Sequence, residues 1–143
     1  MRVVTTLQPI ILYNGGAALN YNTAPGPGTT GTVTLSEDVS GFKRLFVTYR
    51  AEGEAVSPGN PVVTRVVPCL VGSYVGLDVI RYVYDNKAGK EVCQFAAASY
   101  LVGGRTLSYA KRIYGNLYSG SNAGTYCGTD SGQACIMRVE GVR

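Results

Sequence analysis

Polar and apolar residues alternate along most of this 143-residue chain, and no stretch keeps a helical period for more than two turns. The segment Lys43–Arg50 shows the alternation clearly, with Leu45, Val47 and Tyr49 on one face. Clusters of glycine, proline and asparagine separate such segments and mark turns. The pattern predicts strands at 7–13, 32–35, 43–50, 62–70, 74–84, 91–102, 105–114 and 135–143.

Three local features refine this series of strands. Pro68 cannot donate a backbone hydrogen bond, so the strand that contains it is expected at a sheet edge or a bulge. Ser36–Phe42 is predicted to form a single helical turn capped by Ser36. In the strand at 105–114, alternation places one set of residues on a common face: Leu107, Tyr109, Lys111 and Ile113.

About seven to nine strands with half-buried faces must cover one another. We therefore expect an all-β fold, an antiparallel β-sandwich of jelly-roll-like outline, built as one domain from residues 1–143. The loops at 20–31 and 115–124 are long for hairpins, and loops of that length often carry a binding function.

Composition excludes several functional classes. Charged residues are 15% of the chain, against roughly 25% in an average soluble domain, and histidine is absent. Without histidine, the chain has no Ser-His or Cys-His couple and no His-ligated metal site. No apolar run approaches the ~20 residues that span a bilayer. The net charge of +4 comes mostly from scattered single residues, so we expect neither nucleic-acid binding nor membrane insertion.

No pattern of an enzyme stands out among the polar residues. Glu52 and Glu54 share a face if their segment is extended, but they lie beside glycines in a loop where solvated carboxylates are ordinary. Neither a Gly-x-Ser-x-Gly elbow nor a phosphate-binding glycine loop occurs. We expect a protein that is not an enzyme, with no catalytic residues, no metal and no cofactor.

The four cysteines leave one structural question open. They contain no Cys-x-x-Cys pair, which disfavours zinc. Cys127 and Cys135 bracket a polar glycine-containing loop and are placed to close a disulfide in an oxidising compartment. The N-terminus lacks the apolar core of a secretory signal, so we expect synthesis in a cytoplasm, where free thiols are the favoured state.

A binding site is predicted at the late Gly/Ser/Asn loop. Tyrosine offers a flat face with a polar tip, and asparagine offers adaptable hydrogen bonds, a mixture that suits a saccharide. The alternative is that these tyrosines cap the sandwich or pack between subunits. The predicted ligand-binding residues are Tyr114, Asn116, Tyr118, Asn122 and Tyr126.

Assembly with other subunits is a further expectation. Sparse charge leaves large uncharged faces, which tend to be buried against copies or neighbours. We expect the apolar faces of strands 45–49 and 107–113 to form such interfaces. The Pro/Gly-rich arm at 21–30 has a composition that suits a segment lying across an adjacent subunit.

Two parts of the chain resemble modules of tailed-bacteriophage tail proteins. The first is Leu12–Gly15 (LYNG) followed by Gly31–Arg50 (GTVTLSEDVSGFKRLFVTYR), and the second is the ending Ile136–Arg143 (IMRVEGVR). Together they cover about a third of the chain. Such tail modules pair a glycine-ended first strand with a short turn, a tyrosine-ended strand and a closing strand that contains glycine.

The resemblance implies a β-sandwich module of a tail fibre, baseplate or receptor-binding protein. Such modules usually act as trimers, contact other virion proteins, and in several cases bind host cell-surface glycans. Because the chain begins just before the first strand, without a shaft segment, we expect a small free-standing tail component or one that docks on another virion protein. We therefore expect a structural virion protein made in the host cytoplasm. The alternative is a stand-alone carbohydrate-binding module of a bacterial or secreted protein.

Overall fold

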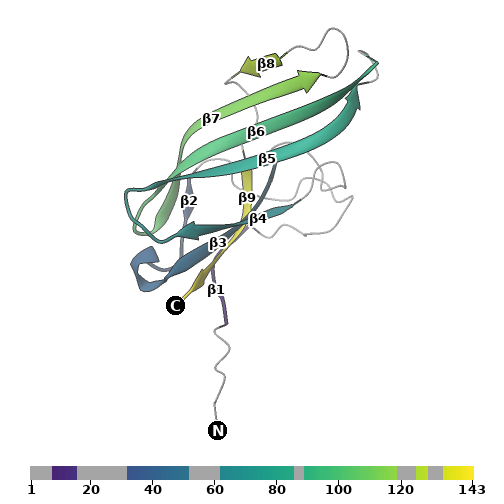
Figure 1. Cartoon of the computed structure of the whole chain (residues 1–143). Helices are drawn as coiled ribbons and strands as arrows, with labels where there is room; N and C mark the ends of the chain where they lie inside the picture. Colours follow the sequence, from purple (N-terminus) through teal and green to yellow (C-terminus); the bar gives the residue numbers. More distant parts are fainter. Residues whose placement is uncertain (1–7, 16–31, 52–61, 86–88, 119–124, 129–133) are drawn as a thin grey trace.

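The computed structural model describes residues 8–15, 32–51, 62–85, 89–118, 125–128 and 134–143. These residues form two antiparallel sheets packed face to face, which confirms the predicted β-sandwich (Figure 1). One sheet has four strands in the order β1-β9-β3-β4, and the other has the order β2-β7-β6-β5 with β8 also paired to β7. The strands are β1 (Ile10–Asn14), β2 (Val33–Thr34), β3 (Arg44–Ala51), β4 (Val63–Pro68), β5 (Tyr74–Asp85), β6 (Lys90–Val102), β7 (Thr106–Tyr118), β8 (Thr125–Gly128) and β9 (Ala134–Val142).

The alternation in β3 places its apolar side in the core. Leu45, Val47 and Tyr49 are each 0% exposed, because β3 lies between β9 and β4 and its inner face is covered by the second sheet. The expectation that the apolar face of this strand forms an interface between subunits is therefore wrong. The predicted edge position of the strand containing Pro68 is confirmed, since β4 ends the four-stranded sheet.

A β-bulge in β7 divides the face that the sequence predicted for 107–113. Tyr109 pairs with Tyr100, whereas Lys111 pairs with Ser99, so Ala110 between them has no partner on β6. The extra residue reverses the alternation. Leu107 stays in the core and Tyr109 packs against it, but the positions from Lys111 onward fall on the opposite face. The prediction of one continuous face is wrong for this reason.

The short turn before β3 is capped by Asp38 instead of Ser36. A 3-10 turn, η1 (Val39–Gly41), follows Asp38, whose carboxylate accepts hydrogen bonds from the Ser40 backbone N–H (2.9 Å) and hydroxyl (2.6 Å). These hydrogen bonds hold the pKa of Asp38 below its usual value. The Ser36 N–H instead donates to the carbonyl of Leu12, joining the turn to β1.

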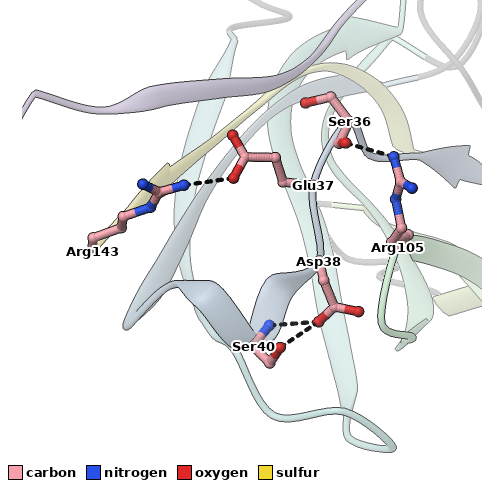
Figure 2. A network of polar contacts seen from close by, with 6 residues as sticks. All are labelled: Ser36, Glu37, Asp38, Ser40, Arg105 and Arg143. Carbon is pink, nitrogen blue, oxygen red and sulfur yellow. Dashed lines mark hydrogen bonds and ion pairs between the residues drawn. The ribbon is translucent and has the colours of Figure 1, made fainter.

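Polar contacts hold this turn against both sheets (Figure 2). Glu37 forms an ion pair of 2.6 Å with Arg143, which follows β9. Arg105, in the turn between β6 and β7, donates to the carbonyl of Ser36 at 2.5 Å. The turn therefore connects the end of β9 to the β6–β7 turn.

The two segments that resemble tail modules lie side by side in the fold. β9 pairs with both β1 and β3, and Phe42 packs against the backbone of Gly141. A Cβ at position 141 would lie 2.5–2.8 Å from three ring carbons of Phe42. Glycine is therefore required here by close approach of the aromatic ring.

Side chains of the four-stranded sheet cover the edge of β5. The Tyr49 hydroxyl donates to the Asp78 carbonyl at 2.8 Å, and Arg65 of β4 donates to the Gly76 carbonyl. Arg65 also forms an ion pair of 2.5 Å with the Asp78 carboxylate. These contacts satisfy backbone carbonyls that an edge strand would otherwise present to solvent or to another chain.

Candidate functional site

Three strands of the second sheet are much longer than their counterparts in the first. β5, β6 and β7 have 12 to 13 residues, whereas β3 has 8 and β9 has 9. In Figure 1 the three long strands form one extended curved layer, with β8 beside the far end of β7. The core cluster takes only the proximal part of this layer, from Val75 to Val79 in β5 and from Ala98 to Val102 in β6.

In its distal part this layer carries apolar side chains on its outer side as well. In the proximal part, Val75, Leu77 and Val79 of β5 point into the sandwich. In the distal part, Ile80, Tyr82 and Tyr84 take the alternate positions, on the outer side, and are 60–63% exposed. On the inner side of the distal part, positions 81, 94 and 116 pair in one row across the three strands and are polar in sequence.

The exposed apolar side chains form one connected surface. Ile80 lies opposite Phe95, and Tyr82 lies opposite Cys93, which in turn lies opposite Leu117 of β7. Directly opposite residues on neighbouring strands share a face, so these rows are adjacent. We call this surface the outer apolar face and define it by Ile80, Tyr82, Tyr84, Cys93, Phe95 and Leu117.

Two exposed charged residues bracket the outer apolar face on its own side of the sheet. Glu91 lies opposite Tyr84 at the distal end, and Lys111 lies opposite Ser99 at the other end. Tyr82 donates a hydrogen bond to Glu91, which raises the pKa of the phenol. The face is thus apolar along its centre, with Glu91 at its distal end and Asp78, which is paired with Arg65, just before Ile80.

The residues predicted to bind ligand lie on strands more than on a loop. The predicted loop at 115–124 is wrong over its first four residues, because β7 continues to Tyr118. Pairing with β8 places Tyr126 opposite Asn116. Tyr118 is half-buried and lies opposite Val92, which is buried.

The register brings four of those five predicted positions into one region. Tyr114 pairs with Gly128 at the other end of the β7–β8 ladder. By register, positions 114, 116 and 118 fall on the face opposite to the outer apolar face. Asn122 lies outside the described residues, as do Glu52 and Glu54. The saccharide site at these positions stays a prediction.

The four-stranded sheet carries a shallow groove on its outer side. The groove has a volume of about 330 Å³. Its lining includes a 3.0 Å hydrogen bond between the hydroxyls of Thr48 and Thr64 and a 2.9 Å ion pair between Arg138 and Glu140. Its two charged groups form an ion pair with each other. The lining residues are Pro9, Phe46, Thr48, Val62, Thr64, Arg138 and Glu140.

The cysteines occupy separate positions in the sandwich. Cys69 and Cys93 are half-buried free thiols, and burial raises the pKa of Cys69. Cys127 belongs to β8 and Cys135 to β9, which are strands of different sheets. Whether these two cysteines are oxidised stays a prediction that a thiol assay decides.

No group of three or more His, Cys, Asp or Glu residues in the described part of the chain is arranged to hold a metal ion. Across the same residues, no helix is long and apolar enough to cross a membrane. Comparisons of the chain with family models, with curated proteins and with solved structures gave no match. The outer apolar face is the strongest candidate for a functional surface.

Proposed function

We propose that the chain is a non-enzymatic structural component of a bacteriophage virion, a tail protein of the fibre, baseplate or tail tip that assembles with copies of itself and with other virion proteins. The observation that carries the assembly role is the outer apolar face. Its four most exposed side chains are 47–63% exposed in a single copy, on a sheet whose opposite side is partly polar in sequence. Water is a poor environment for such a surface, and large apolar patches mark interaction sites.

The resemblance to tail modules supports the virion part of the proposal. The two segments that carry it form adjacent strands, and their distinctive residues Phe42 and Gly141 pack together. The proposal therefore draws on two distant segments that form one packed unit in this chain.

Particle purification tests this function. Virions from the source lysate are banded in a density gradient and examined by mass spectrometry, with an antibody against the purified chain for quantification. We expect the chain to band with infectious particles at a constant copy number per particle. Recovery of the chain only in the soluble fraction would refute the virion role.

A carbohydrate-binding module is the second candidate function. It is favoured by two tyrosines of the outer apolar face. Tyr82 and Tyr84 are about 60% exposed on a sheet surface, and Glu91 beside them is a hydrogen-bond acceptor. Aromatic faces stack on sugar rings while carboxylates accept hydrogen bonds from hydroxyls.

Glycan-array binding tests this second candidate and the predicted site together. Retention lost in Tyr82→Ala but kept in Tyr118→Ala would place the sugar on the outer apolar face. The reverse result would place it at the β7–β8 strands. Absence of retention by the unaltered chain would remove the carbohydrate candidate.

A further inference from the structure

A second exposed apolar surface lies at the other end of β5, where the chain turns from β4 into β5. The turn runs from Leu70 to Ser73, whose N–H donates to the Leu70 carbonyl at 3.1 Å. Its third residue, Gly72, has a φ of 87°, in the left-handed region that favours glycine. Tight turns favour glycine, proline, asparagine, aspartate and serine, yet Leu70 and Val71 open this one and are 63% and 55% exposed. Tyr74 follows the turn and is 65% exposed. We call Leu70, Val71 and Tyr74 the hairpin tip.

Hydrogen bonds hold the turn of the hairpin tip against β6. The Gly72 N–H donates to the carbonyl of Val102 at 2.8 Å, and the Val102 N–H donates to the Ser73 carbonyl at 2.9 Å. The Ser73 hydroxyl donates to the Leu70 carbonyl at 2.7 Å. The protein itself satisfies these backbone groups, so their hydrogen bonds are kept when the tip leaves water.

Two cations flank the hairpin tip. Arg44 lies opposite Pro68, which is two residues before Leu70, and Lys43 precedes Arg44. Both are exposed, and neither forms an ion pair with a residue that the structure describes. They lie at the end of the sandwich where β3 starts and β9 ends (Figure 1).

The carboxylates at this end are matched by other arginines. Glu37 forms an ion pair of 2.6 Å with Arg143, and Asp38 lies within the electrostatic reach of Arg105. Lys43 and Arg44 are therefore in excess, and the surface beside the hairpin tip is positive.

The spacing between the tip and the cations matches the depth of a bilayer surface. Strand residues rise about 3.4 Å each, so Arg44, opposite Pro68, lies about 7 Å behind Leu70 along the strand. Amphipathic elements at a bilayer surface bury their apolar side about 5–10 Å into the boundary between headgroups and acyl chains. With the tip at that depth, Arg44 lies at the level of the lipid headgroups.

We propose that the hairpin tip docks on a lipid bilayer that contains anionic headgroups, with Lys43 and Arg44 at the lipid phosphates. Charge complementarity identifies this occupant, because buried apolar area and attraction to anionic lipids add in surface binding. Tyrosine favours the headgroup layer, which suits Tyr74. A bilayer accepts exposed turn side chains without a matching pocket, whereas a protein partner must supply one. Docking of this kind needs no membrane-spanning segment.

Vesicle co-sedimentation tests the docking. The purified chain is mixed with phosphatidylcholine vesicles and with vesicles in which about a third of the lipid is phosphatidylglycerol. We expect binding to the anionic vesicles that weakens as salt is raised, and little binding to the neutral ones. Leu70→Ser combined with Val71→Ser should weaken binding at least about tenfold. Ile11→Ser is the matched control, since Ile11 is 45% exposed on β1, and it should leave binding unchanged.

Charge and depth are tested by separate variants. Lys43→Gln combined with Arg44→Gln should weaken binding about tenfold, whereas Lys111→Gln, at an exposed position of β7, should leave it unchanged. The chain contains no tryptophan, so Val71→Trp supplies a single fluorescent reporter. Its emission should shift to shorter wavelength on anionic vesicles, and the emission of Ile11→Trp should not.

Three results would overturn the docking. These are no binding to anionic vesicles, equal binding to both kinds of vesicle, and binding that the tip substitutions leave unaffected. Capture of the tip by another virion protein without vesicle binding would identify a protein partner and would also overturn it. Circular dichroism of each variant separates lost binding from lost folding.

The docking goes beyond the virion role and does not depend on it. A chain that bands with particles but ignores vesicles would refute the docking alone. A vesicle-binding chain that is absent from particles would refute the virion role alone.

Discussion

Replacing Gly141 by alanine tests the packing that joins the two ends of the sandwich. The added methyl would lie 2.5–2.8 Å from three ring carbons of Phe42. Carbon atoms in contact prefer about 3.5–4.0 Å, so the ring or the strand must move by roughly 1 Å. Phe42 is 6% exposed and belongs to the core cluster, and it has little room to move without losing contacts.

Overpacking of this kind costs about 1–3 kcal/mol of unfolding free energy. For a domain of this size, a loss of about 2 kcal/mol corresponds to a fall of roughly 8 °C in Tm. Urea unfolding followed by circular dichroism measures the free energy directly. Gly41→Ala is the matched control, because a Cβ there meets no atom within 4 Å, and it should change stability by less than about 0.5 kcal/mol.

A double-mutant cycle identifies the cause. Phe42→Leu shortens the side chain, so Gly141→Ala should cost at least about 1 kcal/mol less in that background than in the unaltered chain. If the costs of the two substitutions simply add, the clash with Phe42 is not the cause of the destabilisation by Gly141→Ala. An unchanged Tm in Gly141→Ala would refute the close approach itself.

Three further predictions concern stability. Tyr49→Phe removes the hydroxyl that bonds the Asp78 carbonyl and should cost about 1–2 kcal/mol. Burial, with the nearby Asp78 charge, raises the pKa of Tyr49. The contribution of Tyr49 to the free energy of unfolding is therefore complete below about pH 10 and is lost above it. In a pH series of urea melts, Tyr49→Phe should reduce this loss of stability at alkaline pH. Hydrogen bonds from Ser40 lower the pKa of Asp38, so stability should fall as pH drops through about 4. The fall should be less steep in Asp38→Ala. Equal slopes of unfolding free energy against pH in the two proteins would contradict this. Leu45→Glu buries a charge in the core and should abolish cooperative folding, whereas a soluble folded variant would contradict the core position.

Strand alternation allowed most of the sandwich to be predicted. The period of two in β3 depends only on which residues avoid water, and Leu45, Val47 and Tyr49 are buried as that period requires. Pro68 identified an edge strand because its missing N–H is a local chemical property. Such features depend on neighbouring residues alone, and the sequence contains all of that information.

The failures arose where distant parts of the chain decide the outcome. Ala110 looks like any strand residue, and only its pairing against β6 makes it a bulge. Ser36 and Asp38 are both good capping residues. Asp38 directly precedes η1 and caps it, whereas Ser36 lies further away and its N–H bonds the carbonyl of Leu12 in β1.

The candidate surface was missed for a related reason. Ile80, Tyr82 and Tyr84 alternate regularly, which indicates a buried side of a strand. Alternation alone does not show which face of the strand is buried, and here positions 79 and 83 take the inner side while Ile80, Tyr82 and Tyr84 lie on the outer side. The available signal was that the even-numbered positions, which are Gly76 and Asp78 before Val79, become apolar from Ile80 onward.

Thiol labelling of Cys93 tests the central claim most directly, because this free thiol lies within the outer apolar face. The labelling rate of each cysteine is measured by peptide mass spectrometry at low and high protein concentration. Cys69, a free thiol beside β4 and away from the face, is the internal control. If copies cover the face, Cys93 labelling slows as concentration rises while Cys69 labelling stays constant. Equal Cys93 rates at all concentrations would contradict an assembly surface there.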